Sequence, residues 1–460
     1  MRVKIIGAGL AGSEASWQLA RRGVAVELHE MRPEKMTKAH KTGKPAELVC
    51  SNSFRGAALS NAVGLLKGEL KVFNSLIMDC ALKAEIPAGG AMAVDRDKFS
   101  GLVEEKLKAE SLIDYIEGEV EEIPEASPES PVIVATGPLT SPSLAASIEK
   151  LTGEEHLAFF DAISPIILGE SINTDLVFKQ SRYDKGGDDY LNIPFNKEEY
   201  HSFIEAVQGA ELYGGKEEVE SDKVDNLRPF EGCMPVEEMI SRGVDTPRFG
   251  PMKPVGLIDP RTGEEPWAVI QLRMDDSDGH RWNMVGMQTK MRRPDQERIF
   301  KSLPGLENAE FVRFGSVHRN SFINSPCCLT PELQLRSQPG LFFAGQITGV
   351  EGYVESTAAG LVAGIGAAHL VQGKALPQFT DETAIGALVS YVSDPDRKDF
   401  QPMNISFGLM PGYLNSPKRR ISKKDRRIKA ANFALEQAEK LASEVPFLTE
   451  IPPEIALESR

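Results

Sequence analysis

Residues 2–12 read RVKIIGAGLAG, a short apolar run that leads directly into a glycine-rich segment. The first five residues of this stretch have the composition of a buried strand, and the Ala-rich residues up to Leu19 are typical of a helix. Residues 24–29 predict a second strand, which ends at Glu30. The segment is therefore a G-x-G-x-x-G loop between a strand and a helix, followed by an acidic residue after the second strand. This order predicts a βαβ unit that binds a dinucleotide.

Each glycine of the loop has its own predicted role. Gly7 permits a tight turn, Gly9 lets a pyrophosphate approach the backbone, and Gly12 lets the helix and strand pack closely. The start of the helix offers free N–H groups and a positive dipole end to the phosphates, while Glu30 can accept hydrogen bonds from a ribose. A glycine-rich turn without a ligand is the alternative interpretation. The predicted dinucleotide site comprises Gly7, Ala8, Gly9, Leu10, Ala11, Gly12 and Glu30.

The signals of this fold return late in the chain. Residues 131–137, PVIVATG, and 340–345, GLFFAG, predict two more buried strands, and Thr357 to Leu370 predicts a helix rich in Gly and Ala. Such a late segment is typical of large FAD proteins, in which it approaches the flavin. A close-packed helix without a ligand is the alternative. The residues expected near the flavin are Gly345, Gly349, Gly352 and Tyr353.

The middle of the chain differs from both ends, since it mixes short strands and loops with Pro and Gly. This pattern predicts an α/β protein in which a Rossmann-like FAD-binding domain is interrupted by an inserted α+β domain. The expected division is 1–155 for the first part of the FAD domain, 156–335 for the insert, and 336–460 for the second part with a C-terminal helix.

Composition excludes several classes of protein. Of the 460 residues, 41% are hydrophobic and 26% are charged, which is ordinary for a globular protein. Five cysteines are too few for a disulfide framework and lack the spacing of a zinc site, so we expect a reducing cytoplasm and no metal. The longest late apolar run, 358–371, is shorter than the roughly 20 residues that span a bilayer. No membrane segment is predicted.

The net charge of −15 disfavours adhesion of the whole chain to nucleic acid, but local basic clusters remain. Residues 418–429, KRRISKKDRRIK, hold eight Lys or Arg residues and one Asp. This is the footprint expected for phosphate binding, although a solvated start of a helix has the same composition. Smaller clusters are Lys290 with Arg292 and Arg293, and Arg182 with Lys185.

Several segments along the chain carry a more specific resemblance. Together they resemble the folate- and FAD-dependent tRNA (uracil-54, C5)-methyltransferase family. The segments are PAELVCSNSFRG at 45–56, RPFEGCMPVEEM at 228–239, GPMKPVGL at 250–257, VHRNSFINSP at 317–326, GQITGVEGYVESTAAGLVAG at 345–364 and FQPMNISFGLMP at 400–411.

The resemblance implies an enzyme that forms 5-methyluridine, at position 54 of the tRNA T-loop. It implies 5,10-methylenetetrahydrofolate as carbon donor, reduced FAD as reductant, and NADPH or NADH as the source of electrons. No obligatory protein partner is implied.

The resemblance also implies two catalytic cysteines, Cys233 as nucleophile and Cys50 close to the flavin. C5 of uracil is a poor nucleophile until a thiolate adds at C6 and creates an enolate. Each thiol must therefore ionise, and Arg228 and Arg55 are the nearby cations in sequence. Cys80, in an apolar helical stretch, is expected to be structural.

Three other functions stay open on sequence alone. The same chemistry could act on a uracil of ribosomal RNA, because the motifs govern the reaction and not the RNA fold. A wobble-uridine modifying flavoprotein is a second alternative, but those relatives are longer and work with a partner GTPase. The third alternative is a non-catalytic RNA-binding flavoprotein, which would tolerate loss of both thiols.

Overall fold

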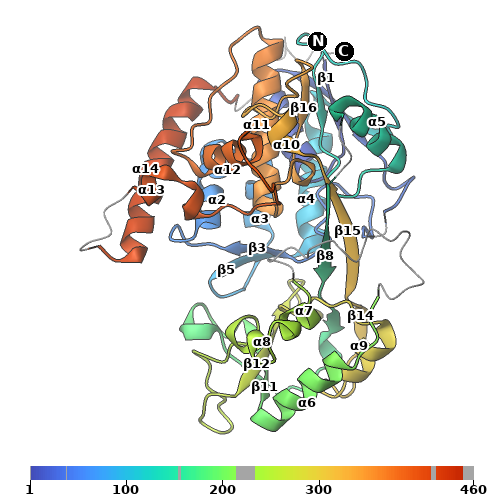
Figure 1. Ribbon diagram of the computed structural model, residues 1–460, viewed down its shortest axis with the longest axis vertical. Helices are drawn as coiled ribbons and strands as arrows, with labels where there is room; N and C mark the ends of the chain where they lie inside the picture. Colours follow the sequence, from blue (N-terminus) through green and yellow to red (C-terminus); the bar gives the residue numbers. More distant parts are fainter. Residues whose placement is uncertain (1, 38, 154–156, 214–233, 416–420, 449–460) are drawn as a thin grey trace.

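A five-stranded parallel sheet lies at the centre of the larger part of the molecule (Figure 1). The computed structural model describes residues 2–37, 39–153, 157–213, 234–415 and 421–448. The strand order is β16-β7-β1-β2-β6, so strands from both halves of the chain share one sheet. The strands are β1 (Arg2–Ile6), β2 (Ala25–Glu30), β6 (Ile113–Glu117), β7 (Val132–Val134) and β16 (Leu341–Phe343).

Two helices with small side chains pack tightly beside this sheet. They are α1 (Leu10–Ala20), which follows the glycine loop, and α11 (Tyr353–Val371). A Cβ atom at Gly360 would lie 2.2 Å from the carbonyl oxygen of Ala11, so only glycine permits this approach. By length and hydropathy α11 could span a membrane, but 83% of its apolar window is buried inside the protein. It is therefore the central helix of the core.

Further helices and a small sheet surround this centre. The helices are α2 (Ala62–Val72), α3 (Leu76–Lys83), α4 (Arg96–Ala109), α5 (Pro142–Thr152), α10 (Ser325–Cys328), α12 (Ala384–Ser393), α13 (Pro411–Leu414) and α14 (Lys423–Glu444). The small sheet consists of β3 (Ser53–Gly56), β4 (Glu85–Ile86) and β5 (Ala91–Val94).

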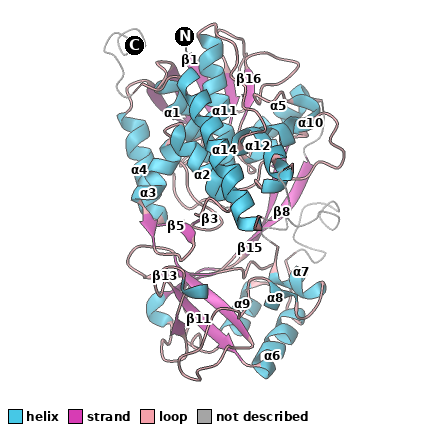
Figure 2. Cartoon of the chain, turned by 90° about the vertical axis from the view of Figure 1, so that its left-hand side faces the viewer, coloured by secondary structure: helices cyan, strands magenta, loops and turns pink. Residues whose placement is uncertain are grey.

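An antiparallel ribbon leads from this part to a second, smaller part. Its strands are β8 (Leu157–Ile163) and β15 (Ser316–Phe322), which run side by side between the two parts (Figures 1 and 2). The chain thus leaves the larger part along β8 and returns to it along β15.

The smaller part is built on a sheet in the order β10-β11-β12-β13-β9-β14, with antiparallel pairing throughout. Its strands are β9 (Ile166–Leu168), β10 (Phe178–Lys179), β11 (Tyr190–Phe195), β12 (Ala268–Met274), β13 (Arg281–Met284) and β14 (Phe311–Arg313). Its α-helices are α6 (Lys197–Gln208), α7 (Val236–Ser241), α8 (Thr246–Phe249) and α9 (Arg293–Phe300).

The predicted architecture is confirmed. A parallel-sheet α/β domain made from both ends of the chain is interrupted by an α+β insert, and each part has its own hydrophobic core. Local boundaries differ from the prediction: α11 starts at Tyr353 instead of Thr357, because Gly352 adopts a φ of 111° and ends the preceding loop there.

Two buried carboxylates cap helices in the larger part. Glu69 accepts hydrogen bonds from the N–H groups of Ala384 and Ile385 at the start of α12, at 2.7 and 2.8 Å. Burial raises the pKa of Glu69 to about 8, although these two bonds lower it. Glu14 accepts in the same way from Ile77, in the first turn of α3, and burial raises its pKa to about 6. Both groups make the fold sensitive to pH.

Candidate active site

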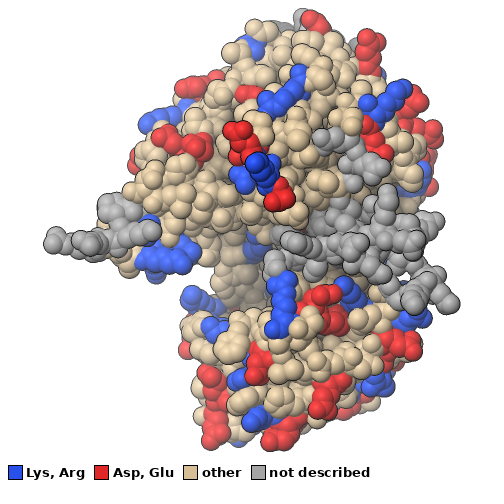
Figure 3. Space-filling view, viewed as in Figure 1, with Lys and Arg blue, Asp and Glu red and all other residues tan. Residues whose placement is uncertain are grey.

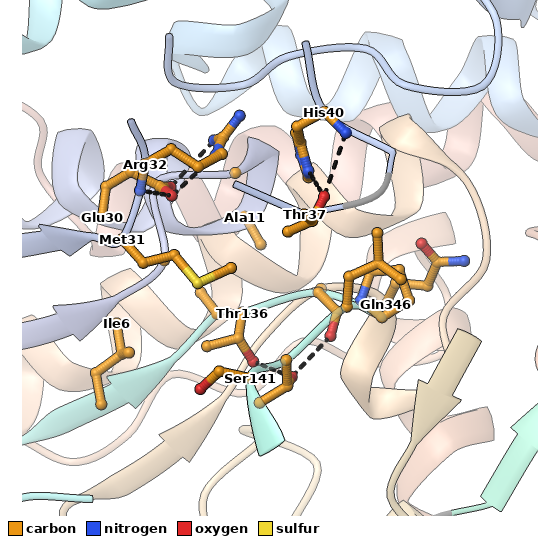
Figure 4. Close-up of a pocket in the computed structure, with 18 of the residues that line it drawn as sticks. Ile6, Ala11, Glu30, Met31, Arg32, Thr37, His40, Thr136, Ser141 and Gln346 are labelled. Carbon is orange, nitrogen blue, oxygen red and sulfur yellow. Dashed lines mark hydrogen bonds and ion pairs between the residues drawn. The ribbon is translucent and has the colours of Figure 1, made fainter. Parts of the chain in front are cut away.

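A large pocket opens at the carboxyl ends of the parallel strands (Figure 4). All five strands are followed by residues that line it, which is the usual ligand position in open parallel sheets. Its empty volume is about 1020 Å³ when the open solvent at its mouth is included. Its lining includes Gly7, Gly9, Leu10, Ala11, Glu30, Arg32, Val49, Thr136, Gly345, Gln346, Tyr353 and Ser356.

The three glycines of the first loop have different surroundings. Gly7 has a φ of 101°, and a Cβ atom there would lie 2.7 Å from the carbonyl oxygen of Ala135. A Cβ atom at Gly12 would lie 1.8 Å from the carbonyl oxygen of Gly7, so the helix and the turn are in direct contact. A Cβ atom at Gly9 would meet no heavy atom within 4 Å. The space in front of Gly9 belongs to the pocket, as a bound pyrophosphate requires.

The start of α1 faces this space without a side-chain cap. Gly9 is the N-cap residue and has no side chain that could accept a hydrogen bond from the first turn. No acidic residue lies in that turn either. The positive end of the helix is therefore suited to a phosphate.

Glu30 lines the pocket but already has partners. Its carboxylate accepts hydrogen bonds from the backbone N–H of Ala8 at 2.9 Å and from Nε and Nη2 of Arg32 at 2.9 and 3.1 Å. The backbone N–H of Arg32 donates a fourth bond at 3.1 Å. Burial raises the pKa of Glu30, but the bonds and charge of Arg32 outweigh it and the pKa lies below its usual value. A ribose would have to share this charged carboxylate with Arg32, which the sequence did not indicate.

The late glycine-rich segment shapes the opposite wall. Gly345, Gly349 and Gly352 all adopt positive φ angles, of 81°, 82° and 111°. Gly345 lines the pocket, whereas Gly349 and Gly352 are not among the lining residues. A Cβ atom at Gly349 would lie 2.4 Å from the ring of Phe400. These glycines let the chain turn sharply so that α11 begins beside the pocket.

Tyr353 joins this wall to the loop that carries Cys50. Its hydroxyl oxygen accepts hydrogen bonds from the backbone N–H groups of Cys50 and Ser51, at 2.9 and 3.1 Å. Burial raises the pKa of the Tyr353 phenol, so it stays neutral. Cys50 is half-buried, and its neighbour Val49 lines the pocket. Two residues that are 303 positions apart in sequence, Cys50 and Tyr353, thus meet at one edge of the site.

Two cations that the sequence did not indicate contact the loop of Cys50. Arg55 pairs with the buried carboxylate of Glu355 in the first turn of α11. This fully buried carboxylate is the ion-pair partner that the structure gives Arg55, which is a candidate cation for the thiol by sequence position only. Arg96 and Arg313 donate instead to backbone carbonyls of the Cys50 loop. No sequence signal marks them, since they come from α4 and β14.

Cys233 and Arg228 lie outside the described residues, as do Lys418, Arg419 and Arg420 of the basic cluster. Cys80 is buried in α3, and burial raises its pKa to about 12, so this thiol is inert. Among the described residues, no group of three His, Cys, Asp or Glu side chains could hold a metal ion.

Fold and pocket together define a dinucleotide-binding α/β protein with an inserted domain. The family model "Glucose inhibited division protein A" matches residues 2–375. The structure of Aquifex aeolicus GidA in its form I crystal is similar, with a TM-score of 0.69 at 17% identity, covering 99% of this chain and 78% of that one. At this identity the likeness concerns the fold alone.

Closer relatives are found by sequence. The methylenetetrahydrofolate–tRNA-(uracil-5-)-methyltransferase TrmFO of Heliobacterium modesticaldum is 54% identical over 451 residues, covering 98% of this chain and all of the relative. The protein of the same name from Listeria innocua is 53% identical over 443 residues, covering 96% and 99%. The chain therefore belongs to the methylenetetrahydrofolate–tRNA-(uracil-5-)-methyltransferase family, and the resemblance drawn from its motifs is confirmed.

Proposed function

We propose that this protein forms 5-methyluridine in tRNA, with 5,10-methylenetetrahydrofolate as carbon donor and FAD as the redox cofactor. The observation that carries this proposal is the 54% identity with a methyltransferase of that name over its entire length. The pocket at the carboxyl ends of the sheet supplies the physical counterpart, a site lined by the glycine loop beside the loop of Cys50. FAD, when bound, supplies the reducing electrons.

The FAD contacts follow from the lining of the pocket. Gly7 to Gly12 and Glu30 would hold the adenosine-diphosphate half, because the uncapped start of α1 and the open space at Gly9 suit a pyrophosphate. Gly345, Gly349 and Gly352 would bring Tyr353 to the flavin. Arg32 keeps Glu30 ionised, which strengthens its capacity to accept hydrogen bonds from a ribose.

Cys233 is the proposed nucleophile toward C6 of uracil, and Cys50 the proposed thiol beside the flavin. The position of Cys50 next to Val49 and Tyr353, both in the pocket lining, supports its assignment. Ionised sulfur is required at C6, because the neutral thiol is a weak nucleophile.

A substitution tests the nucleophile. Cys233→Ala is expected to retain the flavin absorbance of the wild type and to lose RNA methylation, by at least about a thousandfold if covalent activation is required. Cys327→Ala, which removes an exposed thiol elsewhere, is the matched control and should keep full activity. Methylation by Cys233→Ala at the wild-type rate would end the assignment.

The RNA target requires a separate experiment. We propose position 54 of the tRNA T-loop, and ribosomal RNA is the competing target. Mapping of 5-methyluridine in both RNAs from a deletion strain distinguishes them, since loss at the T-loop supports the proposal and loss only in ribosomal RNA contradicts it. Wholly normal RNA would reject both targets.

The electron source is identified with the purified enzyme. NADPH and NADH are added separately, and bleaching of the flavin shows which of them reduces it.

RNA binding is proposed at the start of α14. Figure 3 shows Lys and Arg side chains mixed with Asp and Glu over one face, so RNA binding must depend on local clusters. Lys423, Lys424 and Lys429 are exposed there. By contrast, Lys290 pairs with Glu238, which makes the smaller predicted cluster a weaker candidate.

A cytoplasmic location and action without an obligatory protein partner complete the proposal. The four described cysteines are all free thiols, which suits a reducing compartment.

A further inference from the structure

Three arginines from separate elements converge on the loop of Cys50. Nη1 and Nη2 of Arg313 donate to the carbonyl oxygens of Val49 and Cys50, at 2.8 and 3.0 Å. Arg96 donates to the carbonyl oxygen of Leu48 and, at 3.5 Å, to that of Cys50. The Cys50 loop is therefore hydrogen-bonded both to α4 in the larger part and to β14 in the insert.

Arg273 of β12 holds the next residues of the same loop. Its Nε donates to Oδ1 of Asn52 at 3.1 Å, and its Nη2 donates to Oγ of Ser51 at 3.0 Å. Asn52 in turn donates to the carbonyl oxygens of Val94 and Met274. We call Arg96, Arg273 and Arg313 the arginine cradle.

The arginine cradle carries more positive charge than its protein partners neutralise. Asp275 pairs with Arg96 at 2.9 Å, and it is the only carboxylate in an ion pair with the cradle among the residues that the structure describes. The other acceptors are backbone carbonyls, a hydroxyl and an amide. Nε of Arg313 is buried without a hydrogen-bond partner. Three guanidinium groups against one carboxylate leave two positive charges in excess.

This excess is costly for the folded protein. Burial and then the charge of Arg96 lower the pKa of Arg313 to about 10, and burial lowers the pKa of Arg273. Arg96 also begins α4, where the helix dipole is already positive. A site that keeps such charge is suited to stabilise an anion that forms beside it.

We propose that Arg313 and Arg96 are positioning residues for Cys50, which fix its backbone beside the pocket-lining Val49 and whose charge favours reaction of its sulfur as the thiolate. The proposal rests on the proposed role of Cys50 near the flavin. Among the charged and titratable groups, Arg313 and the neutral Tyr353 interact electrostatically with Cys50. Arg96 pairs with Asp275, and Arg273 contacts the adjoining Ser51 and Asn52. The cradle thereby couples the insert, through β14, to the chemistry of the larger part.

Alkylation of the FAD-loaded enzyme by iodoacetamide tests this without RNA or folate. The thiolate sulfur forms a bond to the CH₂ carbon, the C–I bond breaks and iodide leaves. Mass spectrometry measures the rate at Cys50 relative to the exposed Cys327 in the same sample, from about pH 6 to 9. Arg313→Gln is expected to slow alkylation of Cys50 about tenfold relative to Cys327 near neutral pH.

Two further variants separate charge from fold. Arg313→Lys keeps the charge and should recover most of the relative rate, whereas Arg298→Gln, on an exposed arginine of the same insert, should change nothing. If Arg313→Gln does not fold, Arg96→Gln tests the same prediction from α4. The proposal is overturned if Arg313→Gln leaves the ratio of the alkylation rates of Cys50 and Cys327 unchanged. It is also overturned if Arg313→Gln and Arg313→Lys slow the alkylation of Cys50 equally.

Failure of this proposal can be told apart from failure of the proposed function. If the wild-type enzyme does not methylate tRNA but the alkylation rate of Cys50 depends on Arg313 as predicted, the proposed function is refuted and the role of the arginine cradle is supported. If the wild-type enzyme methylates tRNA normally but the alkylation rate of Cys50 does not depend on Arg313, only the proposed role of the arginine cradle is refuted.

Discussion

Gly9 and Gly12 look alike in the sequence motif but differ in what each contacts. A side chain at Gly12 would collide with the backbone of Gly7, whereas a side chain at Gly9 would enter empty space in the pocket. Gly9 has an ordinary φ of −68°, so alanine there causes no backbone strain. Gly9 therefore leaves room for the ligand, whereas Gly12 is required for the packing of the helix against the turn.

This difference predicts opposite effects of two small substitutions. Gly12→Ala should lower the free energy of unfolding of the FAD-free protein by about 1–3 kcal/mol, because the turn must move to admit a methyl group. Gly9→Ala should leave that free energy within about 0.5 kcal/mol of the wild type and weaken FAD binding, because the methyl group fills space meant for the pyrophosphate.

Thermal unfolding without FAD and fluorescence titration with FAD measure the two quantities. Wild-type FAD affinity in Gly9→Ala would show that the pyrophosphate lies elsewhere.

At the scale of elements, the start of α12 depends on a buried carboxylate. Glu69 keeps its proton to about pH 8 in the folded protein, while its ordinary value is 4.5. Between these values the folded state binds more protons than the unfolded state, so stability falls as pH rises from about 4.5 to 8. Glu69→Gln should flatten this fall, by up to about 1.4 kcal/mol per pH unit.

Denaturant unfolding between about pH 5 and 8 measures that slope. Glu436→Gln, on the exposed side of α14, is the control and should leave the slope unchanged. A slope in Glu69→Gln equal to that of the wild type would mean that Glu69 is ionised throughout this range.

The helix α14 carries the proposed RNA contact on its first turns. Lys423, Lys424 and Lys429 are exposed, whereas Arg426 and Arg427 stack on Tyr413 and Phe407 and dock the helix. Changing the three lysines to Gln should weaken tRNA binding and lower the slope of log affinity against log salt by up to about 2–3 units. FAD content should not change.

The control for this prediction removes equal charge elsewhere. Changing the exposed Lys108, Lys179 and Lys374 to Gln, none of which lies in α14, alters the net charge by the same amount. Equal salt dependence in both triple variants would point to a general charge effect and dismiss α14 as a binding site.

For the whole molecule, two hydrophobic cores joined by a ribbon imply two units of folding. Ile323, Leu329 and Leu335 pack in the larger core, so we propose that the chain re-enters the FAD domain at β15 and not at residue 335. Calorimetry should resolve two transitions, and added FAD should raise the midpoint only of the larger unit. A single transition that FAD shifts as a whole would mean that the contacts between the parts make them one cooperative unit.

The sequence by itself determined the local elements and the class of the protein. Residues 2–12 and Glu30 predicted the strand, turn and helix correctly, because these depend on hydrophobic periodicity and on the conformational freedom of glycine. The same local patterns identified the late strand and helix of the FAD domain, and the motifs identified the family.

Only the tertiary structure decided which charges meet. Arg32 engages Glu30, Arg55 pairs with Glu355, and the cations of the Cys50 loop come from Arg96 and Arg313. Charge interactions depend on distance in space and on burial, and neither quantity can be read from spacing along a chain that leaves a domain and returns to it.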